Sequence, residues 1–137
     1  MGSFLLALTQ GDPAGIGPDI ALMAWMKRTA EAIPPFLYIG DHDILAERAR
    51  LLGLSVPIEA ANETTAPEIF GRALPVLALP TGARVAPGKP DSATATGTIG
   101  AIERGVELAL TGRVAGVVTN PIAKSVLYEA GDRKSVV

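Results

Sequence analysis

Two short segments combine glycine, proline and ionisable side chains in a way that suits ligand binding. The first is QGDPAGIGPD (residues 10–19), with three glycines, two prolines and the carboxylate of Asp12. The second is TNPIAK (residues 119–124), which places the Asn120 amide and the Lys124 ammonium four residues apart. Each segment joins an apolar run to a helical pattern, and such turns often bind anionic groups at a helix N-terminus. We therefore take Asp12, Asn120 and Lys124 as the candidate ligand-binding residues.

The first segment does not fit a dinucleotide-binding fingerprint. The pattern G-x-G-x-x-G would need glycine at position 20 after Gly15 and Gly17, and Ile20 stands there. On the local pattern alone, the segment is either a turn that approaches a ligand closely or a strained turn without a ligand. Asp12 either caps the amides of its own turn or points its carboxylate into a cleft.

Lys124 falls in the first turn of the helix that Pro121 is expected to begin. A lysine there opposes the helix dipole, so the position is costly unless an anion or a carboxylate lies nearby. The residues leave two interpretations open. Lys124 and Asn120 either clamp a phosphate or carboxylate, or Lys124 is a solvated surface lysine.

The other polar candidates have ordinary structural explanations. His42 is the only histidine, so it cannot build a metal site from several imidazoles, and we assign it to the surface or to capping. The hydroxyls of residues 92–98 (SATATGT) are expected to cap a helix. The chain has no cysteine, which excludes a thiol nucleophile and a cysteine-based zinc site. We therefore predict neither a catalytic nor a metal-binding residue in this sequence.

Hydrophobic periodicity predicts the elements that hold the two loops. Strands are expected at residues 4–9, 36–39, 56–59, 74–79 and 114–119, and helices at residues 18–32, 42–52, 121–130 and from Ser92 or Thr94 to Leu110. The continuous apolar run of the first strand predicts a central strand buried on both faces, and the last strand is also expected to be buried. Asp41 is expected to cap the second helix and Gly53 to end it. Pro75 favours an edge strand or the first residues of a strand, and residues 62–72 are expected to be irregular. The alternation predicts an α/β fold with a mainly parallel sheet and flanking helices. In such sheets ligands bind beyond the carboxyl ends of the strands.

The composition narrows the class of protein. A chain of 137 residues with 48% hydrophobic residues is sufficient for one folded domain. A net charge of −2 and 4% aromatic residues argue against a nucleic-acid partner. The apolar stretch near the N-terminus is too short for a signal peptide or a membrane span. We expect a cytoplasmic protein without a membrane or nucleic-acid partner.

Three segments closely resemble the family of 4-hydroxythreonine-4-phosphate dehydrogenases of vitamin B6 biosynthesis. They are GDPAGIGPDIAL, PGKPDSATATGTIGAIERGVELAL and VVTNPIAKSVLYEAG, and the resemblance covers residues 5–131. The first is also similar, more distantly, to the GDGIGPE loop of isocitrate and isopropylmalate dehydrogenases. The resemblance implies an incomplete N-terminal part of a two-domain architecture of that isocitrate/isopropylmalate-dehydrogenase-like kind, with the site in the cleft between the domains.

The resemblance also implies a reaction. NAD oxidises 4-phosphooxy-L-threonine to the 3-oxo acid, which decarboxylates to 3-amino-2-oxopropyl phosphate in pyridoxal phosphate biosynthesis. It further implies a divalent metal (Zn, Mg or Co) that polarises the reacting hydroxyl. Histidines from both subunits of a homodimer are expected to bind this metal. The small phosphorylated substrate is expected to meet Asp12, Asn120 and Lys124, whereas the metal ligands are absent here and the NAD-binding residues are not identified.

The resemblance stops at Gly131. The family continues with a segment resembling F-x-F-P-G-H-T-E-F, whose His-Thr pair binds substrate, whereas this sequence continues DRKSVV. One of its possible back-translations, GAT CGG AAG AGC GTC GTG, matches a common sequencing-library adapter. We therefore expect residues 1–131 to be the N-terminal portion of the dehydrogenase, residues 132–137 to be a non-native tail, and the chain to be an inactive truncation. The alternatives are a related NAD-dependent dehydrogenase of another four-carbon sugar-acid phosphate, or a non-catalytic anion-binding fragment.

Overall fold

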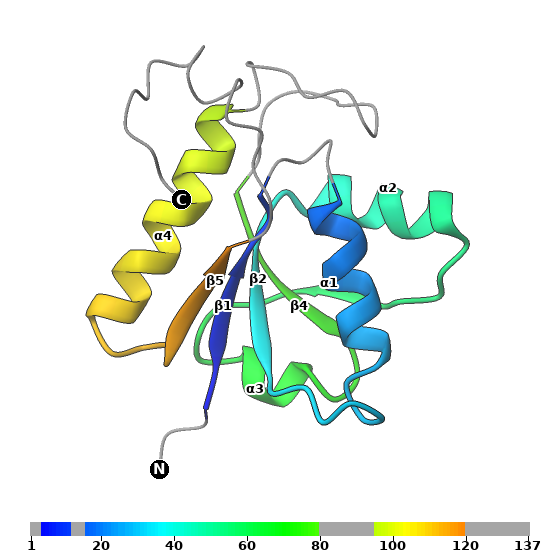
Figure 1. Ribbon diagram of the computed structural model, residues 1–137, viewed down its shortest axis with the longest axis horizontal. Helices are drawn as coiled ribbons and strands as arrows, with labels where there is room; N and C mark the ends of the chain where they lie inside the picture. The colour runs from blue at the N-terminus through cyan, green and yellow to red at the C-terminus, as the bar shows by residue number, and fades with distance from the viewer. Residues whose placement is uncertain (1–3, 12–15, 80–94, 120–137) are drawn as a thin grey trace.

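Strands and helices alternate around one parallel sheet (Figure 1). The computed structural model describes residues 4–11, 16–79 and 95–119. The elements are β1 (Leu6–Thr9), α1 (Gly17–Met26), β2 (Phe36–Gly40), α2 (His42–Leu52), β3 (Ile58–Ala60), α3 (Ala66–Ile69), β4 (Leu74–Ala78), α4 (Ala95–Leu110) and β5 (Gly116–Thr119). Within this part of the chain the strand order is β3-β4-β2-β1-β5 and every pairing is parallel. The predicted α/β class with a parallel sheet is confirmed.

The two central strands are apolar on both faces because helices cover both faces of the sheet. Leu8 and Tyr38 pack with α1 and α2 on one face. Ala7, Leu37 and Ile39 pack with α3 and α4 on the other. The first strand of the chain lies between β2 and β5, as its continuous apolar run predicted. None of the helices described is long and apolar enough to cross a membrane.

The ends of α2 follow the local signals in the sequence. The Asp41 carboxylate accepts hydrogen bonds from the amides of Asp43 at 2.9 Å and Ile44 at 3.2 Å, which satisfies two amides of the first turn. Gly53 ends the helix with φ of 70°, a left-handed conformation that glycine adopts without strain. Both predictions are confirmed, and α2 therefore begins directly at the carboxyl end of β2.

The first helix is shorter than predicted. It ends at Met26 instead of continuing to residue 32. Residues 27–32 form turns instead, and Arg28 anchors the end of the helix, because its guanidinium donates to the carbonyls of Trp25 at 2.9 Å and of Gly71 at 3.0 Å. It also lies 3.6 Å from the centre of the Trp25 ring. The side chain thus binds the end of α1 to the turn before β4, and the chain turns back toward β2.

Three other predictions need correction. Residues 62–72 are not wholly irregular, because the Asn62 carboxamide accepts from the amides of Thr64 and Thr65 and this turn leads into α3. The third strand starts at Ile58, later than expected. The last strand starts at Gly116 and, within the described residues, forms an edge of the sheet, so Val118 is 45% exposed although we predicted a buried strand.

Pro75 shows which of its two expected positions is correct. It is the second residue of β4, a strand that pairs with β3 on one side and β2 on the other. The pairing with β2 begins only at Val76. The edge alternative is therefore wrong, and the alternative that places the proline among the first residues of the strand is confirmed.

A partly buried ion pair joins α1 to α2. The guanidinium of Arg48 donates to the carboxylate of Asp19 at 2.5 Å, and the side chains are 6% and 35% exposed respectively. Asp19 also lies in the first turn of α1, where a negative charge is favourable. The pair therefore fixes the N-terminal turn of α1 against the middle of α2.

Replacing Asp19 by alanine should lower the free energy of unfolding by about 2–3 kcal/mol, because a buried guanidinium then loses its carboxylate. Urea titration followed by the fluorescence of Trp25, the only tryptophan, measures this. Glu47→Ala is the matched control, since the Glu47–Arg50 pair is exposed and such pairs contribute about 0–1 kcal/mol. Equal losses in the two variants would contradict the prediction.

Candidate functional site

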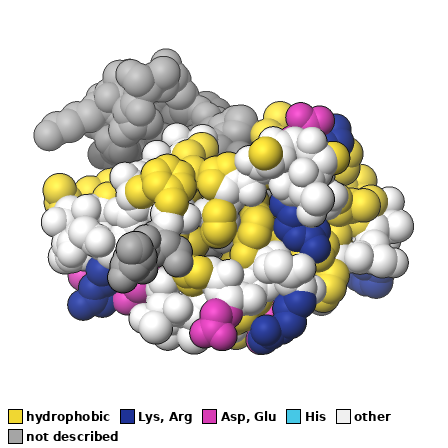
Figure 2. Space-filling view, turned by 90° about the horizontal axis from the view of Figure 1, so that it is seen from below, with side chains coloured by type: hydrophobic (Ala, Val, Ile, Leu, Met, Phe, Trp, Pro, Cys, Tyr) yellow, Lys and Arg dark blue, Asp and Glu magenta, His cyan; other side chains and the backbone are white. Residues whose placement is uncertain are grey.

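The carboxyl ends of β1, β2 and β5 lie at one end of the sheet, and both predicted ligand-binding loops start from this end. The strand β1 pairs with β5 in the register Thr9 to Thr119, and the strand β2 lies on its other side. The opposite end, seen from below in Figure 2, carries hydrophobic side chains across its middle with Lys, Arg, Asp and Glu side chains around them. Parallel strands that end at the same level send their following loops to one side.

The two predicted loops leave neighbouring strands. The segment with Asp12 begins just after β1, and Asn120 comes directly after Thr119. Asp12, Asn120 and Lys124 themselves lie outside the described residues, as do residues 92–94 and the helix expected at 121–130. Their roles therefore stay predictions, while the strands that lead into both loops are adjacent.

Gln10 connects the ends of β1 and β2. Its amide donates to the Ile39 carbonyl at 3.0 Å, and its side-chain oxygen Oε1 accepts from the Asp41 amide at 2.9 Å. The side chain is fully buried and lies over Gly40. A Cβ at position 40 would lie 2.7 Å from Gln10 Cβ and 2.5 Å from Oε1. Gly40 is therefore the residue that leaves room for the glutamine.

Gly40→Ala should lower the free energy of unfolding by about 1–3 kcal/mol, because the new methyl group overlaps Gln10 Cβ, which cannot move without its strand. Urea titration of the chain gives the value. Gly100→Ala is the control: a Cβ there meets nothing within 4 Å, and alanine favours a helix. If Gly40→Ala is as stable as the unchanged chain, Gly40 is not needed to make room for the Gln10 side chain.

The start of α1 differs from the start of α2. Ile16 precedes the first turn of α1, and no side chain there caps the helix amides. Pro18 occupies the first turn, as predicted, and removes one amide that would need a partner. The first loop therefore leads into a helix whose N-terminal end is not capped by a described side chain.

His42 is partly exposed and does not cap the helix amides. It lies in the first turn of α2, where Asp41 is the capping residue, and its Nδ1 atom lies 3.6 Å from a carboxylate oxygen of Asp43. With Arg50 it lines a shallow, mostly apolar groove of about 600 Å³ between α2 and the connection to β3. Among the residues described, no three His, Cys, Asp or Glu side chains gather as a metal site. These residues do not fit the divalent metal that the resemblance implies.

Sequence reasoning missed the interior partners of the site. The sequence pattern gives Gln10 no role beyond its place in the first loop, and gives Gly40 none beyond its place after an apolar run. Helical spacing alone does not show that Arg48 is buried and paired with Asp19. A glutamine directly after a fully apolar strand, followed by glycine at the end of the neighbouring strand, is the signal that was available.

Known proteins resemble the chain in both sequence and fold. A family profile described as "Pyridoxal phosphate biosynthetic protein PdxA" matches residues 31–135. The chain is 52% identical over 128 residues to a curated relative, a 4-hydroxythreonine-4-phosphate dehydrogenase of Methylorubrum populi, and the match covers 92% of this chain and 37% of that protein. The chain thus spans about 37% of the length of this relative.

Two solved structures extend the comparison. A 4-hydroxythreonine-4-phosphate dehydrogenase from Burkholderia phymatum has a TM-score of 0.87 at 21% identity, covering 100% of this chain and 42% of its own. At that identity the likeness shows the fold alone. A terephthalate 1,2-cis-dihydrodiol dehydrogenase from Burkholderia xenovorans has a TM-score of 0.72 at 25% identity, covering 96% of this chain and 38% of its own.

Proposed function

The chain belongs to the PdxA family of pyridoxal phosphate biosynthetic proteins, and from this premise we propose that it forms part of the substrate site of a dehydrogenase. The substrate proposed is 4-phosphooxy-L-threonine, with NAD as the hydride acceptor and the 3-oxo acid as the product that decarboxylates. The whole enzyme is proposed to be a cytoplasmic homodimer. Residues 1–131 correspond in this proposal to the N-terminal portion, and the non-native origin of residues 132–137 stays a prediction.

The single observation that supports this proposal is the pairing of β1 with β5. In the register Thr9 to Thr119, the loops that carry Asp12 and Asn120 start from adjacent strands at the same end of the sheet. The two motifs are more than 100 residues apart in sequence. A single small ligand can therefore contact both loops, which is what a site for a four-carbon phosphate requires.

The side chains of the two loops suit different groups of that substrate. The Lys124 ammonium suits a phosphate or carboxylate oxygen, and the Asn120 carboxamide can donate to the same anion. The Asp12 carboxylate suits the substrate's ammonium or hydroxyl group. NAD would serve as the hydride acceptor in the whole enzyme, and Asp12, Asn120 and Lys124 would bind and orient the substrate. The described residues do not fit a divalent metal, so no step through a metal is assigned to them.

Two alternatives have different consequences. One alternative is a related NAD-dependent dehydrogenase of another four-carbon sugar-acid phosphate, and the likeness to a terephthalate dihydrodiol dehydrogenase shows that the fold also occurs in a dehydrogenase of a different substrate. The chain by itself, with one histidine, instead fits a non-catalytic fragment that binds anions. Both alternatives keep the fold and the two loops. The first changes the substrate that is oxidised, and in the second no substrate is oxidised.

A fusion protein distinguishes the proposed function from the two alternatives. It joins residues 1–131 of this chain to the part of the Methylorubrum populi relative that follows the matched region. We expect it to form NADH with 4-phosphooxy-L-threonine and not with unphosphorylated 4-hydroxy-L-threonine or terephthalate dihydrodiol. Preference for the dihydrodiol, or for another four-carbon sugar-acid phosphate, would favour the related dehydrogenase. Folded fusion protein that oxidises none of them would contradict the proposed function.

A further inference from the structure

Two fully buried polar groups have no hydrogen-bond partner among the residues that the structure describes. They are the side-chain nitrogen Nε2 of Gln10 and the hydroxyl oxygen Oη of Tyr38, and both residues are 0% exposed. Buried polar groups in folded proteins are almost always paired with protein atoms or with ordered water. Each group therefore requires a partner that the described chain does not supply.

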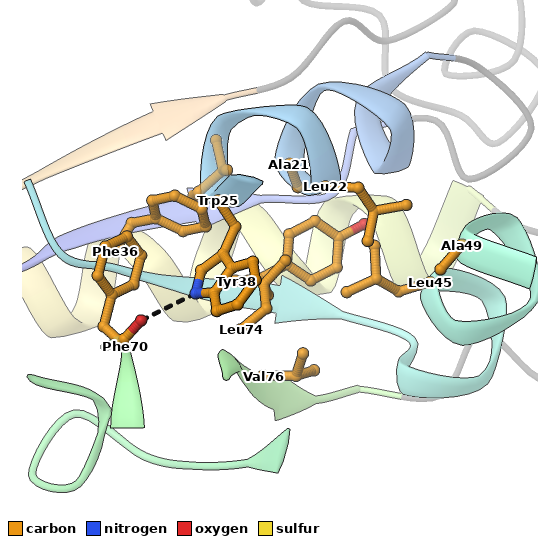
Figure 3. Close-up of a cluster of buried hydrophobic side chains, with 11 residues drawn as sticks. Ala21, Leu22, Trp25, Phe36, Tyr38, Leu45, Ala49, Phe70, Leu74 and Val76 are labelled. Atoms are coloured by element: carbon orange, nitrogen blue, oxygen red, sulfur yellow. Dashed lines mark hydrogen bonds between the residues drawn. The ribbon is translucent and has the colours of Figure 1, made fainter. Parts of the chain in front are cut away.

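The strand register puts these two groups on the same face of the sheet. Leu8 pairs with Tyr38, and the Gln10 amide continues the ladder by donating to Ile39. Since side chains alternate along a strand, Tyr38 and the glutamine that covers Gly40 project to the side of α1 and α2. Figure 3 shows the Tyr38 hydroxyl pointing toward Leu22 and Leu45, where these two helices meet.

Three charged groups act electrostatically on the Tyr38 hydroxyl. Burial raises the pKa of Tyr38 above its usual value, Arg48 lowers this pKa, and the carboxylates of Asp41 and Asp19 raise it. The phenol is therefore neutral and keeps its proton for donation. Gln10 belongs to the same neighbourhood, because its Oε1 atom accepts from the Asp41 amide. Donors and carboxylate acceptors thus meet between the ends of β1 and β2 and the two helices.

The chemistry of these groups selects the ligand. An amide nitrogen and a protonated phenol are donors, so they do not ligate a metal cation. The charges that act on Tyr38 are of both signs, the Arg48 guanidinium on one hand and the Asp41 and Asp19 carboxylates on the other, so they favour neither an added cation nor an added anion. A neutral molecule that accepts two hydrogen bonds and donates others satisfies all the groups, and a water molecule has this pattern. We propose that Gln10 Nε2 and Tyr38 Oη bind one buried water molecule, which links the start of the first loop to the α1–α2 pair.

The inference does not depend on the proposed function. The sign of the change in melting temperature caused by Tyr38→Phe tests it. A hydroxyl that hydrogen-bonds a buried water stabilises the fold, whereas an unsatisfied buried hydroxyl destabilises it. Tyr38→Phe should therefore lower the melting temperature of the chain by about 3 °C or more. Trp25 fluorescence follows the melt. An unchanged or raised melting temperature would overturn the proposal.

A double-mutant cycle on Gln10 and Tyr38 tests whether the two residues bind the same water molecule. Gln10→Met removes one donor to the water, so adding Tyr38→Phe to that variant should cost less than half of what it costs alone. Thr111→Val is the control, because the Thr111 hydroxyl donates to the Glu107 carbonyl at the end of α4, and its cost should add fully to that of Gln10→Met. Additive losses for Gln10 and Tyr38 would show that no molecule links them.

A crystal structure of the fusion protein gives a direct second measurement. We expect one ordered water within about 2.7–3.2 Å of both Gln10 Nε2 and Tyr38 Oη. Direct hydrogen bonds from these atoms to protein carbonyl or carboxylate groups, including those of the first loop, would overturn the proposal.

Discussion

Lys124→Met in the fusion protein should lower kcat/KM for 4-phosphooxy-L-threonine about ten- to a hundredfold. The ammonium is expected in the first helical turn after β5, where the helix dipole makes a positive charge costly unless an anion binds. A charge-assisted hydrogen bond to phosphate or carboxylate contributes about 1.5–3 kcal/mol, and each 1.4 kcal/mol corresponds to about tenfold in rate. The fold should stay intact because methionine keeps the length of the side chain. Steady-state kinetics on purified variant and parent fusion proteins measure the effect.

Lys27→Met is the matched control for Lys124→Met. Lys27 is exposed just after the end of α1, away from the carboxyl ends of the strands. Its removal should leave kcat/KM unchanged within about twofold, because solvated surface charges contribute little. If Lys124→Met behaves like this control, the lysine is a solvated surface group and the clamp interpretation is wrong.

The 137-residue chain alone should form no NADH above background with 4-phosphooxy-L-threonine and a divalent metal, whereas the fusion protein should turn over. The chain has one histidine, and the described residues contain no cluster of three metal-ligating side chains. Removing metal from the fusion protein with a chelator should abolish its activity, and adding metal back should restore it. Metal-dependent turnover by the purified chain would contradict this expectation.

The parallel sheet was predictable because its signals are local. Continuous apolar runs in β1 and β2, the Asp41 cap and the Gly53 stop each depend on a few neighbouring residues. The length of α1 was not predictable in this way. The end of α1 is anchored by a contact of Arg28 with the Gly71 carbonyl, 43 residues away, which local periodicity does not show. The exposure of Val118 likewise depends on the strand order, which periodicity does not determine.

The candidate site was predictable as two loops but not as a set of interior contacts. Glycine, proline and charged residues mark the loops in the sequence itself. The roles of Gln10 and Arg48 arise from residues on other elements: the amide of Asp41 and the carboxylate of Asp19. A glutamine or an arginine at such positions looks like an ordinary surface residue until the register of β1 and β2 and the packing of α1 on α2 are known.

A crystal structure of the fusion protein with 4-phosphooxy-L-threonine bound tests the central claim most directly. The claim is that the loops following Thr9 and Thr119 together hold the substrate, because their strands are paired. We predict substrate density between these two loops, with Lys124 Nζ within about 2.7–3.2 Å of a phosphate or carboxylate oxygen. Substrate bound elsewhere, with Lys124 turned into solvent on the other side of the sheet, would contradict the account.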